Sequence, residues 1–172
     1  MLLMEFEQTN GRRSSERDWF GKCATSPSFE PERHEYRRET SSTDRLAYIH
    51  AAINKSRWIL DLKENWDEEG AEPYAEETWK RATDLLITYA ERALSNYGME
   101  ISAPAISPGP DGSIDLHWNA RDHGFDLLLN VRKKGDPAGA AGFYGCNDSG
   151  TEIKGTFDPD TFNKGLLDWL IP

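Results

Sequence analysis

The clearest pattern in the chain is an alternation of apolar and polar residues along residues 111–131. Apolar side chains occupy every second position on both sides of a polar turn at residues 119–124, and they are Ile114, Leu116, Trp118, Phe125, Leu127, Leu129 and Val131. A period of two predicts a β-hairpin with one buried face and one solvated face. Pairing Trp118 with Phe125 would place all seven side chains on the same face, which then needs a cover of helices.

Two stretches before this hairpin have the periodicity of amphipathic helices. The first covers residues 44–62, and the second covers residues 75–96, where the apolar residues recur at heptad spacing: Trp79, Ala82, Leu86, Tyr89 and Ala93. The short connector between them favours an antiparallel pair. A third, short helix is predicted at residues 159–170, because Asp158 is a suitable N-cap and Pro159 suits the first helical position.

The remaining alternation predicts an antiparallel meander. Its strands are expected at about residues 103–107, 113–118, 125–132, 140–146 and 151–157, separated by turns rich in Gly, Pro, Asn and Asp. The predicted fold class is α+β, with the antiparallel helix pair and the short C-terminal helix packed on one face of a 4–5 stranded antiparallel β-meander. We expect residues 44–172 to form this single domain.

Residues 1–43 have no sustained period and are rich in Arg, Glu, Ser, Thr and Pro. They are expected to form a disordered or loosely attached N-terminal arm. Within it, Trp19 and Phe20 form a candidate hydrophobic anchor that would order on a partner or on the domain itself. The alternative is a tail in which these aromatic residues have no role.

The charge of the chain limits its partners. It carries 30 Asp and Glu against 20 Lys and Arg, a formal net charge of −10. An anionic surface is repelled by phosphate backbones, and no basic stripe interleaved with aromatic residues is present, so direct nucleic-acid binding is disfavoured. A basic protein partner is compatible with this charge. The sequence does not fix an oligomeric state.

Several features of the sequence favour a cytoplasmic protein. No apolar run is long enough to span a membrane, and the start of the chain has neither a secretory signal nor an apolar region after Arg12 and Arg13. Cys23 and Cys146 are far apart in regions of different character, which favours reduced thiols over a disulfide.

Candidate chemistry is sparse, because the sequence contains no recognisable nucleophile, phosphate-binding or zinc motif and implies no cofactor. The best cluster lies on the polar face of the hairpin, where His117 is expected opposite Asp126, with Asp115 two residues along. Such a group could bind a divalent metal or act as an acid/base pair. The alternative is a set of cross-strand electrostatic contacts.

The connector between the two long helices carries a second candidate. Trp66 is followed by three acidic residues, Asp67, Glu68 and Glu69. One aromatic residue rimmed by carboxylates is typical of a protein docking surface. The spacing does not match a calcium-binding EF-hand loop. The alternative is a run of solvated acids beside a Trp66 that packs under the connector and pins the helices together.

Two motifs together resemble a widespread type of small bacterial protein that has no known activity. The connector NWDEEGA is similar to its W-D-G-x-G-A motif, and PAISPGPDGSIDLHW is similar to its P-x-I-x-P-x-x-D-G-G-I-x-L-E-W hairpin. The match covers residues 60–118. This sequence departs from the pattern at Glu68, Ser113 and His117. The resemblance implies a compact α+β fold and a bacterial or phage origin.

The preferred functional hypothesis is a non-enzymatic, acidic protein-interaction module. It would be an accessory, inhibitory or antitoxin-like regulatory subunit of a bacterial or phage system, such as a defence-associated one, and it would bind through its acidic surface, its N-terminal arm or an edge strand. The alternative is a metal-assisted hydrolase or nuclease that uses Asp115, His117 and Asp126. A small-ligand sensor with a pocket between sheet and helices is a third option.

Overall fold

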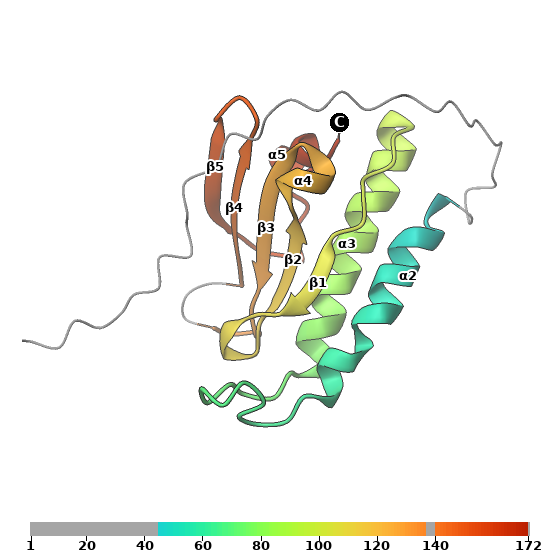
Figure 1. The fold of residues 1–172 in the computed structure, drawn as a ribbon. Helices are drawn as coiled ribbons and strands as arrows, with labels where there is room; N and C mark the ends of the chain where they lie inside the picture. Colours follow the sequence, from blue (N-terminus) through green and yellow to red (C-terminus); the bar gives the residue numbers. More distant parts are fainter. Residues whose placement is uncertain (1–44, 137–139, 172) are drawn as a thin grey trace, which may run out of the picture.

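The computed structural model describes residues 45–136 and 140–171. Five strands form one antiparallel sheet in the order β1-β2-β3-β4-β5, so that each strand pairs with its neighbours in sequence (Figure 1). The strands are β1 (Ala105–Pro108), β2 (Ile114–Trp118), β3 (Phe125–Val131), β4 (Ala141–Asn147) and β5 (Glu152–Phe157). The predicted α+β class and the antiparallel meander are confirmed.

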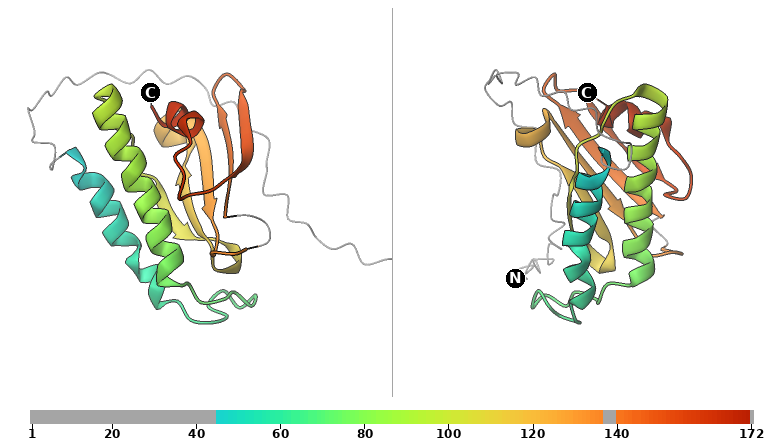
Figure 2. Two further views of the ribbon diagram at one scale, coloured as in Figure 1. Left: turned by 180° about the vertical axis from the view of Figure 1, so that it is seen from behind. Right: turned by 90° about the vertical axis from the view of Figure 1, so that its right-hand side faces the viewer.

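Helices cover one face of this sheet. The helices are α2 (Ala47–Lys55), its 3-10 continuation η1 (Ser56–Asp61), α3 (Glu76–Tyr97) and α5 (Lys164–Leu170). The first two long helices run antiparallel, with α3 nearer the middle of the sheet and α2 beside it, while α5 lies over the β4 and β5 side (Figure 2). Of the described helices, none is long and apolar enough to cross a membrane.

The core lies between these two layers. The heptad residues of α3 are all buried, and so is the inward row of the hairpin apart from the half-buried Phe125. Glu76 and Glu77 occupy the first turn of α3, where the helix dipole favours negative charge, and Gly98 ends the helix with φ 67°. The helix and the hairpin therefore bury the faces that their periodicities predicted.

The register of the central hairpin differs from the predicted one. Trp118 lies opposite Leu127 rather than Phe125. The reason is the turn: Asn119 caps a short helix, α4 (Ala120–His123), by accepting a hydrogen bond from the N–H of Asp122 at 3.1 Å. The helix lengthens the loop between the paired residues to 119–126, which is two residues more than the predicted turn at 119–124. Because the shift is an even number, the predicted apolar row stays on the inner face.

The start of the C-terminal helix was also predicted wrongly. Helix α5 begins at Lys164, and its N-cap is Asn163, whose side chain accepts from the N–H of Leu166. The Asp158 side chain instead accepts from the N–H of Asp160 at 3.0 Å, which makes a turn. Arg81 of α3 holds both acids of this turn, at 3.0 and 2.9 Å. The capping residue was therefore used by a turn and not by a helix.

Candidate functional site

The connector between η1 and α3 has a defined backbone that is held by its own side chains. The Oδ1 of Asp67 accepts hydrogen bonds from the N–H of Glu69 at 2.9 Å and of Ala71 at 3.0 Å. The Oδ1 of Asn65 accepts from the N–H of Gly70 at 2.8 Å. The acidic run is thus a folded turn in which Asp67 has a structural role.

One residue of this turn has a backbone conformation that favours glycine. Glu68 has φ 61°, in the left-handed region, and the resembling pattern has glycine at that position. Glycine adopts this conformation without steric cost, whereas a residue with a side chain is strained there. The departure therefore keeps the shape of the turn at some cost in backbone energy.

Trp66 does not pack beneath the connector as one alternative proposed. Its side chain is 39% exposed, and its ring contacts Tyr74 at a centroid distance of 6.3 Å and an interplanar angle of 54°. Tyr74 is buried, and its hydroxyl donates to the carbonyl of Gly109 at 2.8 Å. Tyr74 therefore joins the connector to the β1–β2 turn and presents Trp66 at the surface.

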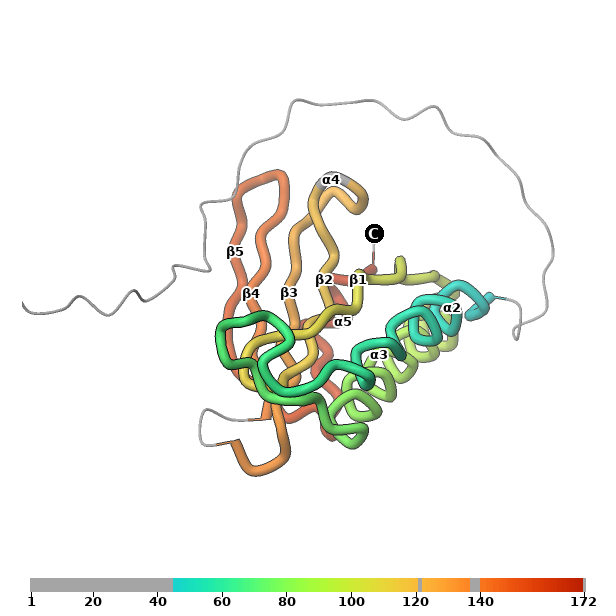
Figure 3. Tube along the Cα trace, turned by 60° about the horizontal axis from the view of Figure 1, so that its bottom comes forward, coloured from blue at the N-terminus to red at the C-terminus, as the bar shows by residue number. Residues whose placement is uncertain are grey.

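A cleft of about 480 Å³ lies between the connector and the β1–β2 turn. The two segments are far apart in the sequence but meet at the same end of the molecule (Figure 3). The walls are formed by Trp66, Tyr74, Pro108 and Pro110, and the charged residues of the lining are Asp67, Glu69 and Asp111. Among the described residues, no Lys or Arg lines this cleft.

The cleft has a negative electrostatic character. The pKa of the Tyr74 hydroxyl is raised, first by burial and then by the nearby carboxylates of Asp67, Asp115 and Asp111, while a hydrogen bond with Trp66 lowers it. A negative field raises the pKa of a phenol because it opposes formation of the phenolate. The same field would favour a cation at this position.

A buried polar cluster supports the β1–β2 turn from behind. Asp115 is only 8% exposed, and the side-chain amide of Asn130 donates to it at 2.6 Å and to Ser113 Oγ at 2.7 Å. Ser113 Oγ in turn donates to the carbonyl of Pro110 at 2.6 Å. A Cβ at Gly109 would come within 2.5 Å of Ser113 Oγ. These contacts fix the turn that forms one wall of the cleft.

Burial also affects the ionisation of this cluster. The pKa of the Asp115 carboxyl is raised by desolvation, and the raise is opposed by the Asn130 hydrogen bond and by the charges of His117 and Arg132. The hydrogen bond supports the carboxylate, whereas burial penalises it. Asp115 therefore has the environment of a structural carboxyl that holds a turn.

The predicted catalytic trio is only partly brought together. His117 and Asp126 are in contact, with Nε2 and Oδ1 at 3.2 Å, although His117 lies opposite Leu128 in the register rather than opposite Asp126. Both side chains are more than a third exposed. Asp115 is engaged by Asn130. Within residues 45–136 and 140–171, no three His, Cys, Asp or Glu side chains are placed to hold a metal ion.

Two other predicted features have different outcomes. Cys146 is disulfide-bonded, so the prediction of reduced thiols is wrong for this residue; Cys23 lies outside the described residues. Trp19 and Phe20, the candidate anchor of the N-terminal arm, also lie outside them.

The sequence identified one of the two segments that line the cleft. It identified Trp66 and the acids of the connector, and it missed Tyr74 and residues 108–111, which complete the walls. One signal was present: the two motifs of the resemblance, the connector and the proline-rich turn before β2, are the two segments that meet here.

Comparison with protein-family models, with curated proteins and with solved structures gives no match for this chain. Its function must therefore be inferred from the cleft itself.

Proposed function

We propose that this protein is a non-enzymatic interaction module that binds a basic segment of a protein partner in the connector cleft. The observation that carries the proposal is the exposed Trp66 in a cleft whose charged lining residues are all acidic. The connector and the β1–β2 turn are each held by internal hydrogen bonds, so the cleft is preorganised for binding.

A Lys or Arg side chain of the partner fits this chemistry. Its cationic group would lie over the ring of Trp66, where a cation–π contact contributes about 0.5–2 kcal/mol. The carboxylates of Asp67, Glu69 and Asp111 would give charge complementarity, which mainly speeds association and selects a basic partner. Tyr74 and the two prolines would contact the aliphatic part of the side chain.

The biological role that we attach to this activity is regulatory. The protein would act as an accessory, inhibitory or antitoxin-like subunit of a bacterial or phage system, such as a defence-associated one. The net charge of −10 supports a basic protein as the partner and disfavours nucleic acid.

We also propose the cytoplasm as the location of the protein. The disulfide at Cys146 is a reason to test this directly, because disulfides persist mainly in oxidising compartments. Fractionation of native cells with cytoplasmic and envelope marker proteins gives the answer, and recovery with the envelope markers would contradict the proposal.

The decisive experiment compares three baits in a quantitative pull-down from the native host. The baits are the parent chain, Trp66→Ala, and Trp58→Ala as a matched control, because Trp58 is 48% exposed but lies in η1, outside the lining of the cleft. We expect one stoichiometric partner that the parent and the Trp58→Ala bait recover equally. Trp66→Ala should bind it about 30-fold more weakly, which corresponds to about 2 kcal/mol.

Two results would overturn the proposal. The first is the absence of any stoichiometric partner. The second is a partner that Trp66→Ala retains with the affinity of the parent. A bound partner should also dissociate as salt is raised, because the contacts at the rim of the cleft are between charges.

The alternative proposal is a metal-assisted hydrolase or nuclease centred on His117 and Asp126, and the contact of these two side chains at 3.2 Å is the observation that favours it. Its test is the activity assay described with the outer-face variants in the Discussion.

A further inference from the structure

Within residues 45–136 and 140–171, strand β5 is an edge strand of the sheet. Among the described residues, it pairs only with β4 (Figure 1). Most of its side chains are exposed. The edge strand at the other side of the sheet is β1, and it lies beside α2 and η1. An edge strand presents backbone N–H and C=O groups that can pair with another strand.

The hydrogen bond across the β4–β5 turn shows which backbone groups of β5 point away from β4, toward the open edge of the sheet. The N–H of Asn147 donates to the carbonyl of Thr151 across the turn, at 3.1 Å. Hydrogen-bonded and non-hydrogen-bonded pairs alternate along an antiparallel ladder, so the backbone of Ile153 bonds to β4. The residues that direct their backbone groups outward are therefore Glu152, Lys154 and Thr156.

We propose that the edge strand β5 pairs with β5 of a second copy of the chain. The two strands run antiparallel, with a two-fold axis at Ile153. This register places Glu152 of each copy directly opposite Lys154 of the other, on the outer face of the sheet. It therefore forms two opposite-charge pairs and aligns the outward backbone groups of both strands.

Charge selects this register over its neighbours. A shift by one step in either direction moves the axis to Glu152 or to Lys154 and places two like charges directly opposite each other, which is destabilising. An axis at Ile153 is thus the arrangement in which the patch is complementary to itself, as a two-fold interface requires.

The inner face of the sheet is apolar beside this edge strand. A cleft of about 490 Å³ lies between β4, β5 and α5, and its apolar lining residues are Phe143, Ile153, Leu166 and Trp169. In the proposed dimer the two Ile153 side chains meet at the axis on this face. The clefts of the two copies join there, so strand pairing buries apolar surface as well as backbone groups.

The net charge of −10 on each copy opposes association at long range. At an ionic strength of about 0.15 M the Debye length is about 8 Å, so distant charges are largely screened while pairs in direct contact are screened less. Dimerisation should therefore be measured at this ionic strength.

Sedimentation equilibrium of the full chain, from about 5 to about 500 µM, tests the proposal, because this range brackets the affinity of a weak strand-mediated dimer. We expect the mass to rise from monomer to dimer. Lys154→Glu and Glu152→Lys each turn two attractive pairs into two repulsive ones and should weaken the dimer about tenfold or more. The double variant Glu152→Lys/Lys154→Glu restores complementarity and should restore the dimer.

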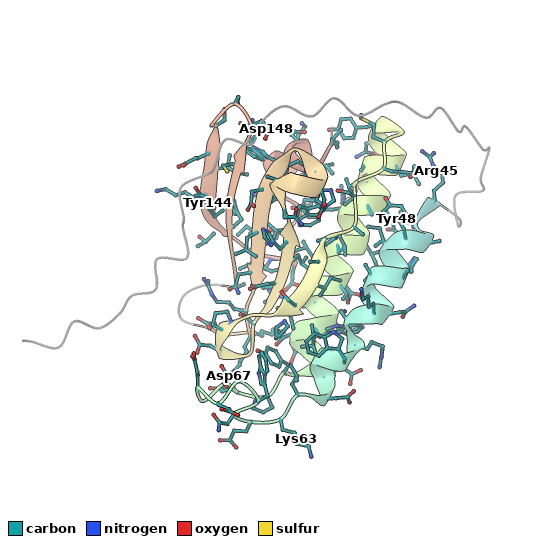
Figure 4. The ribbon with its side chains drawn as sticks, in the orientation of Figure 1. Arg45, Tyr48, Lys63, Asp67, Tyr144 and Asp148 are labelled. Atoms are coloured by element: carbon teal, nitrogen blue, oxygen red, sulfur yellow. The ribbon has the colours of Figure 1, made fainter. Side chains whose placement is uncertain are left out.

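Two control variants separate this effect from others. Lys63→Glu makes the same change in net charge as Lys154→Glu, but in the connector, far from β5, and should dimerise like the parent (Figure 4). Tyr144→Phe removes the hydroxyl that donates to Glu152 at 3.2 Å and should also dimerise normally. Circular dichroism checks that each variant is folded.

A monomer at every concentration would overturn the proposal. So would a dimer that neither single charge reversal weakens, since its interface would lie elsewhere. A double variant that stays monomeric would refute the register with its axis at Ile153.

Discussion

The two faces of the sheet are built by the same strands but stabilised by different kinds of interaction. On β3, adjacent leucines show the contrast: Leu127 points to the inner face and is fully buried, whereas Leu128 points to the outer face and is half-buried. The inner face depends on apolar contact, which is non-directional and tolerates a shift by two residues. The outer face depends on directional polar contacts, such as those of Asp115, and these exist in one register only.

The largest expected effect comes from breaking the inner face. Leu127→Ala should lower the free energy of unfolding by about 2–5 kcal/mol, because it leaves a cavity in the core between the sheet and the helices. Its matched control is Leu128→Ala, which removes the same atoms from the outer face and should cost less than half as much. Urea unfolding followed by circular dichroism measures both, and equal losses would contradict the contrast between the faces.

The next effect concerns the polar cluster behind the β1–β2 turn. Gly109→Ala should cost about 1–3 kcal/mol, because the added Cβ would overlap Ser113 Oγ and Asp115 Oδ1, at 2.5 and 2.8 Å. Gly165→Ala is the control, since its Cβ would meet Asn163 Oδ1 at 3.3 Å and alanine favours the α5 helix. A neutral Gly109→Ala in the same unfolding assay would show that the cluster is loosely packed.

A smaller effect should appear in the pH dependence of stability. Burial raises the pKa of Asp115 in the folded state, so the folded protein binds a proton there more tightly than the unfolded chain. Stability should therefore rise as pH falls through the folded pKa, with the full gain reached below the unfolded pKa.

Asp115→Asn removes this contribution and keeps an acceptor oxygen for Asn130. The variant should be at least as stable as the parent at pH 7. As the pH is lowered, the stability of the parent should rise relative to that of the variant. Melting temperatures of both proteins between pH 7 and pH 4 give the comparison. A variant that is much less stable at pH 7 would show that the charged carboxylate itself stabilises the fold.

The smallest effect on stability is expected at the exposed pair of the outer face. His117→Ala and Asp126→Asn should each change the free energy of unfolding by less than about 1 kcal/mol, because exposed ion pairs contribute little. The same variants test the hydrolase alternative. If a broad hydrolase and nuclease panel detects activity in the parent that both variants lose while staying folded, the pair is catalytic.

The sequence predicted which side chains face the core, because side-chain parity follows from alternation alone. It did not predict the register of β2 and β3, because the length of their loop depends on the cap that Asn119 provides to α4. It misplaced the start of α5 because Asp158 can cap a helix or form a turn, and its contact with Arg81 of α3 supports the turn.

The candidate site was predictable only in part for a related reason. The sequence of the connector identified Trp66 and its acidic neighbours. The cleft requires the tertiary contact between Tyr74 and Gly109, which joins segments 35 residues apart and leaves no periodic signal. Asp115 was grouped with His117 because they share a face, although its hydrogen-bond partner is Asn130.

The strand order β1-β2-β3-β4-β5 also has a kinetic consequence. Every strand pair closes only the loop that directly joins it, so the sheet can grow one hairpin at a time without a costly long-range closure. Among the described elements, the docking of the helices on the sheet brings distant parts of the chain together. We therefore expect refolding to be fast for a mixed α/β domain, with the helix–sheet contacts formed last.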